Sequence, residues 1–107
     1  MSSLIPQTLL SDIPNLYDTE GVLDPLCHVK LFTPDSNFTW YIIEISKEEK
    51  ESSTCYGYVQ GMESELGYFS LNELSSIRGP LGLKVERDLS FEPTLFSRIK
   101  KDEHEHR

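Results

Sequence analysis

FTPDSNFTWYIIEIS, residues 32–46, is the stretch that decides the fold of this chain. The residues PDSN at 34–37 favour a turn, because proline presets φ, Asp and Ser bond to nearby backbone groups, and Asn tolerates a left-handed conformation. Strand-forming residues stand on both sides of this turn. The stretch therefore predicts a β-hairpin.

Residues 38–46 form the second strand of this hairpin. Alternation places Phe38, Trp40, Ile42 and Glu44 on one face and Thr39, Tyr41, Ile43 and Ile45 on the other. Both faces are apolar, which is typical of a central strand that is covered on two sides. The second face is covered either by helices of this chain or by a partner.

The remaining segments predict more strands and a few short helices. Strands are expected at 27–33, 54–62 and 83–91, with a short one at Tyr68–Phe69 after a turn at Gly67. Helical segments are expected between Pro6 and Pro14, from Ser70 to Arg78 with a capping box of Ser70 and Glu73, and from Pro93 to Lys101. The predicted fold is α+β, an antiparallel β-meander of about four to five strands with two or three short helices packed on it. We expect a single globular domain over residues 1–101 and a disordered tail at 102–107.

Gly57 and Gly61 lie within the third predicted strand. Glycine inside a strand marks a bulge or the close approach of a large group. Trp40, across the sheet, is the expected neighbour.

The chain is strongly acidic. It has 107 residues, of which 10 are Lys or Arg and 18 are Asp or Glu, so the formal charge is −8. Residues 1–97 hold 6 basic and 15 acidic groups, a balance of −9. Phosphate binding depends on clustered Lys and Arg, so nucleic acid is not the expected ligand. The acidity favours a basic protein partner, because opposite fields steer encounter; the alternative is that it serves solubility alone.

The sequence carries no evident membrane segment or secretion signal. No apolar run approaches the roughly 20 residues needed to cross a bilayer, and the N-terminus lacks the basic region and cleavage site of a signal peptide. We therefore expect a cytoplasmic protein in which Cys27 and Cys55 are reduced, buried thiols. The spacing of these cysteines and His28 is not that of a zinc site, and we expect no metal and no cofactor.

Five residues are candidates for an interaction surface. Tyr56, Tyr58 and Tyr68 concentrate aromatic side chains in adjacent strands, and Glu63 and Glu65 flank them. Tyrosine is enriched at protein interfaces, so this group predicts a binding patch with an acidic rim.

A second candidate site is a polar pocket. His28 is the one histidine outside the C-terminal tail, and it is grouped with Asp35 and Arg87. None of the common nucleotide-binding or hydrolase motifs occurs in the sequence, so no catalytic residue is assigned.

Three ordered blocks of sequence carry a family resemblance. They are FTPDSNFTWY at Phe32–Tyr41, GYVQGMESELGYFSLNEL at Gly57–Leu74 and IRGPLGLKVERDLSFEP at Ile77–Pro93. With them, the chain from about Pro14 to Pro93 resembles an uncharacterised bacterial domain family that is common on plasmids and conjugative elements. Phe38 stands where the family pattern has Trp. The resemblance implies a cytoplasmic protein of mobile elements, often encoded near antirestriction and transfer genes, and it implies no reaction.

These observations predict a small non-enzymatic protein-interaction domain whose partner is a basic or nucleic-acid-binding protein. A narrower version makes it an inhibitor of a host defence or DNA-handling enzyme, with an acidic surface that replaces nucleic acid. The alternative is a small-molecule-binding protein or small enzyme with a pocket near His28, Asp35 and Arg87. The chain is expected to be a monomer or homodimer that contacts neither nucleic acid nor membrane directly.

Overall fold

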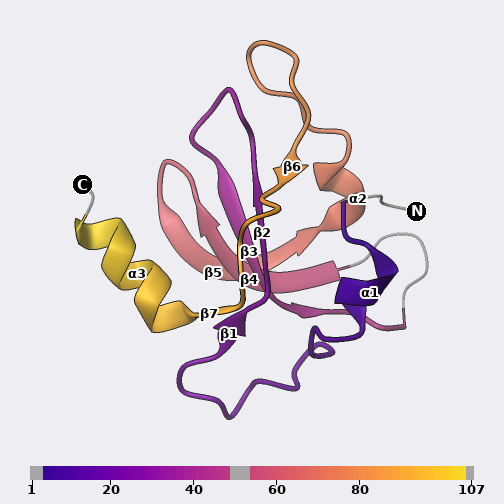
Figure 1. Cartoon of the computed structure of the whole chain (residues 1–107), viewed down its shortest axis with the longest axis vertical. Helices are drawn as coiled ribbons and strands as arrows, with labels where there is room; N and C mark the ends of the chain where they lie inside the picture. The colour runs from indigo at the N-terminus through magenta and orange to yellow at the C-terminus, as the bar shows by residue number, and fades with distance from the viewer. Residues whose placement is uncertain (1–3, 49–53, 106–107) are drawn as a thin grey trace.

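Five antiparallel strands form the main sheet, in the order β5-β4-β3-β2-β6 (Figure 1). The computed structural model describes residues 4–48 and 54–105. The strands of this sheet are β2 Val29–Phe32, β3 Thr39–Ile45, β4 Thr54–Gln60, β5 Ser64–Ser70 and β6 Glu86–Arg87. A second, two-stranded sheet pairs β1 Leu26–Cys27 with β7 Thr94–Leu95, and the helices are α1 Gln7–Leu10, α2 Leu71–Leu74 and α3 Phe96–Glu105. The predicted α+β meander is confirmed.

The hairpin at residues 34–37 joins β2 to β3 as the sequence predicts. The backbone N–H of Thr33 donates to the carbonyl of Phe38 at 3.1 Å, which closes the turn. β3 is the central strand, and its residues from Trp40 to Ile45 are all buried.

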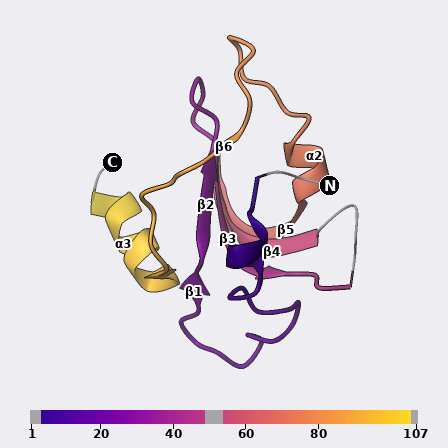
Figure 2. The ribbon, with the colours of Figure 1, turned by 45° about the vertical axis from the view of Figure 1, so that its right-hand side comes forward.

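Helices of the chain itself cover both faces of β3, as the nearly edge-on view of Figure 2 shows. On one face, Trp40 and Ile42 pack in a cluster with Leu71 and Leu74 of α2 and with Ile13, which follows α1. The other face has its own cluster, in which Ile99 of α3 packs with Tyr41, Ile43 and Tyr58. The covering of β3 therefore needs no partner.

A β-bulge between Ile42 and Glu44 shifts the register of β3 against β4. As a result Ile45 packs with Ile42 and Trp40, while Glu44 lies opposite Tyr56 on the face of Tyr41. The prediction that placed Glu44 on the face of Trp40 and Ile45 on the face of Tyr41 is therefore wrong. It assumed that successive residues alternate between the two faces without interruption, whereas a bulge contains an extra residue that the partner strand does not match.

The two glycines of the third predicted strand each face a close neighbour. A Cβ at Gly57 would overlap the carbonyl oxygen of Tyr41, beside the bulge, and a Cβ at Gly61 would lie 2.5 Å from the ring of Phe38. The predicted close approach is present, but Trp40 is not the neighbour at either position.

Several predicted elements differ in length. Gly67 is not a turn residue: it lies inside β5, opposite Gly57, and β5 is seven residues long. The cap of α2 is confirmed, since the hydroxyl of Ser70 accepts from the backbone N–H of Glu73 at 3.3 Å. The helix nevertheless ends after one turn, at Leu74. Serine favours such early ends because its hydroxyl bonds to local backbone, and Ser75 here donates to the carbonyl of Asn72.

The C-terminal part also departs from prediction. Of the expected strand at 83–91 only Glu86–Arg87 pairs with β2, and β7 occupies the start of the expected last helix. α3 continues to Glu105, so residues 102–105 are helical and not a frayed tail. Residues 49–53, which connect β3 to β4, and residues 106–107 of the expected tail lie outside the described part of the chain.

The two cysteines are buried on opposite faces of the sheet and are not joined by a disulfide. Burial, together with the nearby Asp24, raises the pKa of Cys27 to about 12. Among residues 4–48 and 54–105, none of the helices is long and apolar enough to pass through a membrane.

Candidate functional site

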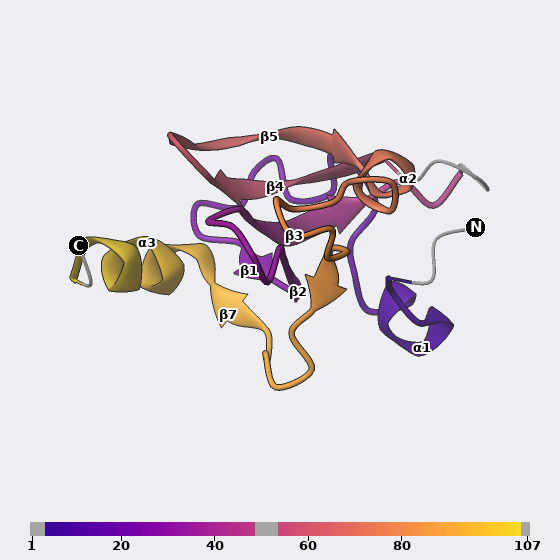
Figure 3. The ribbon, with the colours of Figure 1, turned by 90° about the horizontal axis from the view of Figure 1, so that it is seen from above.

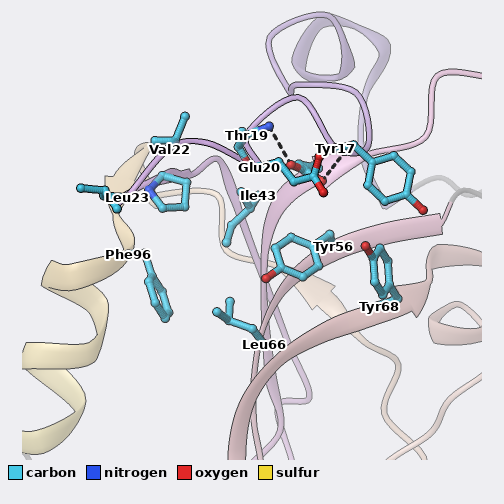
Figure 4. Close-up of a pocket in the computed structure, with 12 residues that line it drawn as sticks. Tyr17, Thr19, Glu20, Val22, Leu23, Ile43, Tyr56, Leu66, Tyr68 and Phe96 are labelled. Atoms are coloured by element: carbon cyan, nitrogen blue, oxygen red, sulfur yellow. Dashed lines mark hydrogen bonds between the residues drawn. The ribbon is translucent and has the colours of Figure 1, made fainter.

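A pocket of about 260 Å³ opens beside the outer strands of the main sheet (Figure 4). Its walls come from residues 17–25, β4, β5, the bulged part of β3 and the first residue of α3. We call this cavity the tyrosine pocket. It is lined by Tyr17, Thr19, Glu20, Val22, Leu23, Pro25, Ile43, Glu44, Tyr56, Leu66, Tyr68 and Phe96.

Three tyrosines stand along one side of the pocket. The ring of Tyr68 lies between those of Tyr56 and Tyr17, with centroid distances of 5.1 and 6.5 Å. Tyr17 and Tyr68 are 60% and 57% exposed, whereas Tyr56 is half-buried and its hydroxyl points into the pocket (Figure 4). Aromatic faces are therefore presented to whatever enters.

Glu44 brings a buried carboxylate to the same pocket, with only 3% of the residue exposed. The backbone N–H of Tyr17 donates to its Oε1 at 2.8 Å, and the backbone N–H of Thr19 donates to its Oε2 at 2.9 Å. The hydroxyl of Thr19 also donates to Oε2. Tyr17 has φ of +72°, a left-handed conformation that is uncommon for an aromatic residue. The carboxylate thus fixes an unusual turn that places the Tyr17 ring beside Tyr68.

Acidic side chains reach the tyrosine pocket from two places. Glu44 lies within it and the exposed Glu20 stands at its rim, and its lining includes no Lys, Arg or His from the described part of the chain. No described residue forms an ion pair with either carboxylate. Aromatic faces attract cations through the ring quadrupole, and carboxylates make their strongest hydrogen bonds to cationic donors. The groups that line this pocket therefore favour a cation over an anion.

The structure brings together only part of the predicted interaction surface. Tyr56 and Tyr68 meet in the tyrosine pocket. Tyr58 is buried beneath α3, where its hydroxyl donates to Glu103 Oε1 at 2.6 Å. Glu63 lies in the turn before β5, and Glu65 points to the opposite face of the sheet from Leu66 and Tyr68, because neighbours along a strand alternate.

The predicted polar pocket is not formed as a group of three. His28 and Arg87 line one pocket of about 180 Å³, together with Asp12 and Asp88. Burial lowers the pKa of His28, against an opposing effect of Asp12, while Lys47 adds to the lowering. Asp35 lies elsewhere, at the turn of the hairpin, where its Oδ2 accepts from the backbone N–H of Leu81 at 2.7 Å. Its role there is to hold the loop that follows α2.

No group of three or more metal-ligating side chains comes together within residues 4–48 and 54–105. Cys27 and Cys55 cannot share an ion, since the sheet separates them.

Sequence reasoning missed Glu44 and Tyr17 as site residues. A signal for Glu44 was present: it is the only charged residue within the apolar run from Trp40 to Ile45. Its place in the pocket depends on the bulge, which the sequence does not reveal. Tyr17 falls in a segment that reads as an irregular connector, and no local pattern relates it to Tyr68.

Comparison with known proteins identifies the family of this chain. The chain has no significant match among curated proteins or among solved structures. A family model matches residues 4–99 and is described as a protein of unknown function, DUF2958. This agrees with the resemblance to an uncharacterised domain family. Since the match spans most of the chain, the protein belongs to the DUF2958 family.

Proposed function

We propose that this protein is a non-catalytic interaction domain that holds a basic side chain of a partner protein in the tyrosine pocket. One observation carries the proposal: three tyrosines and two carboxylates line a pocket that no basic residue within 4–48 and 54–105 enters. An ammonium or guanidinium group would complete this arrangement.

The energetics favour a lysine or arginine of a macromolecular partner. A cation over an aromatic face contributes about 0.5–1 kcal/mol when exposed and about 2 kcal/mol when desolvated. Such a contribution alone gives weak binding, so the rest of the affinity must come from a larger contact. The acidic balance of −9 over residues 1–97 adds long-range attraction to a basic surface.

An enzyme that binds nucleic acid is a suitable partner, because its channel presents Lys and Arg. In this narrower version the protein inhibits by occupying the channel. Binding to such an enzyme should then be lost when duplex DNA is added, and simultaneous binding of protein and DNA would exclude mimicry.

Selection from a phage library of random heptapeptides tests the proposal. The intact protein should enrich peptides that contain Lys or Arg, and their binding should weaken as salt is raised. Tyr68→Ala and Glu20→Lys should each weaken the selected peptides by about tenfold.

Glu86→Lys is the matched control. It makes the same charge change at an exposed residue of β6, the opposite edge of the main sheet from β5, and it should leave affinity within about twofold because exposed, distant charges are screened. Equal losses from Glu20→Lys and Glu86→Lys, or enrichment of peptides without basic residues, would contradict the proposal.

A further inference from the structure

β5 is an open edge of the main sheet that runs beside the tyrosine pocket. It is the first strand in the sheet order, and among the described strands it pairs only with β4 (Figure 3). Its seven residues pair with β4 without a register shift. Edge strands often carry a bulge, a proline or charged side chains that prevent further pairing, and β5, with the sequence SELGYFS, has no bulge, no proline and a single charged residue, Glu65.

The backbone of β5 directs alternate hydrogen-bonding groups outward. Ser46 N–H donates to the carbonyl of Thr54, so the even-numbered residues of β4 bond to β3 and the odd-numbered ones bond to β5. Gly57 pairs with Gly67 in β5. It follows that the backbone N–H and C=O groups of Gly67 bond to β4. The corresponding groups of Leu66 and Tyr68 point away from the sheet.

Leu66 and Tyr68 are also the two residues of β5 that line the tyrosine pocket. Residues opposite each other in an antiparallel pair project their side chains to the same face. A strand added to β5 would therefore place every second side chain on the face of the pocket. Adjacent strands are about 4.8 Å apart, so a cation on such a side chain reaches the Tyr68 ring within the roughly 6 Å over which cation–π attraction acts.

We propose that the partner supplies an extended segment that pairs with β5 as a sixth, antiparallel strand and places a Lys or Arg side chain in the tyrosine pocket. The inference rests on the proposed function and adds the form of the partner. Charge selects this occupant over a second copy of the chain, because two copies would each bring a formal charge of −8 and a Glu65 to the same edge.

Amide hydrogen exchange of the full-length protein tests strand addition. The probe is the peptide Thr-Val-Thr-Lys-Thr-Val-Thr with acetylated and amidated ends, and the matched peptide has Glu in place of Lys. The lysine peptide should slow exchange at Leu66 and Tyr68 by about tenfold or more. It should leave Gly67 unchanged, because that amide already bonds to β4. The glutamate peptide should have no effect.

N-methylation of the probe supplies a control within the peptide. The lysine must lie opposite Leu66 or Tyr68 to enter the pocket, so the amides of the lysine and both valines face β5 while those of the threonines face solvent. Methylating the two valines should weaken binding by about tenfold, and methylating the two inner threonines should change it little. Equal effects of the two methylated peptides would overturn strand addition.

A second probe, Nα-acetyl-lysine methylamide, tests the proposed function without strand addition, because it carries the lysine side chain but is too short to form a strand. If it shifts resonances of Tyr56 and Tyr68 while the peptide leaves the Leu66 and Tyr68 amides unprotected, strand addition is wrong and the pocket proposal stands. If neither probe acts on the pocket, both proposals fail. Protection of these amides without peptide, accompanied by a doubled mass in solution, would show that a second copy occupies β5 and would overturn the inference.

Discussion

Two glycines that face each other across β4 and β5 differ in the space that surrounds them. A Cβ at Gly57 would overlap backbone atoms of Tyr41, whereas a Cβ at Gly67 meets nothing within 4 Å. Gly57→Ala should lower the free energy of unfolding by about 1–3 kcal/mol or more, because backbone cannot move aside as a flexible side chain can. Gly67→Ala should raise it by about 0.4–1 kcal/mol by restricting the unfolded chain. Urea denaturation of both variants checks this, and equal effects would contradict it.

His28 gives the protein a pH dependence on the acid side. Its pKa lies below the ordinary value of 6.5 in the folded chain, chiefly because of burial. The unfolded chain therefore binds more protons in this range, and the free energy of unfolding falls as the pH drops below about 6.5. His28→Asn should remove this decline between pH 7 and 5 in urea denaturation. An unchanged decline in the variant would assign it to other groups.

Among the elements, α3 depends on a partly exposed polar contact. Glu103 accepts from the Tyr58 hydroxyl through Oε1 and from the Ser64 hydroxyl through Oε2, each at 2.6 Å. Glu103→Ala should destabilise the protein by about 1.5–3 kcal/mol, since hydrogen bonds to charged groups are stronger than neutral ones. Arg98→Ala is the control in the same helix; it removes an exposed pair with Asp102 and should cost about 0.3–0.5 kcal/mol. A similar loss from both variants would mean that Glu103 contributes only helix propensity.

Elements set by local chemistry were predictable from the sequence. The turn at 34–37 follows from its residue types, and the cap of α2 follows from Ser70 and Glu73 at the right spacing. Elements set by distant contacts were not. β5 extends over seven residues because it pairs with β4, which overrides the turn preference of Gly67. The same limit applies to the tyrosine pocket, whose walls lie as far apart in the chain as Tyr17 and Phe96.

At the scale of the whole molecule, the cluster beneath α3 determines stability at alkaline pH. Burial raises the pKa of Cys27 to about 12 and that of Tyr41 to about 12, with smaller contributions from nearby acidic groups. Groups with raised pKa keep their protons longer in the folded chain, so the contribution of these two groups to stability is complete below pH 9 and is lost as the pH rises from 9 to 12.

Urea denaturation between pH 8 and 11.5 measures this decline. Cys27→Ala should reduce its slope by about half above pH 10, where Tyr41 remains as the second group. The comparison rests on the slope, so any loss of packing in the variant at pH 8 does not affect it. A slope equal to that of the intact protein would show that Cys27 is not involved.

The bulge in β3 makes the count of residues in that strand as important as their identity. Regular pairing without the bulge, with Ile43 kept, would turn Glu44 into the cluster of Trp40 and Leu74 and Ile45 toward the tyrosines. Removing Ile43 would instead take away the residue that β4 does not match, so Glu44 would stay opposite Tyr56 and Ile45 would stay opposite Cys55. The extra residue and the bulge therefore belong together: losing the bulge alone would exchange a carboxylate and an isoleucine between an apolar interior and a binding pocket, while losing both would leave each on its present face.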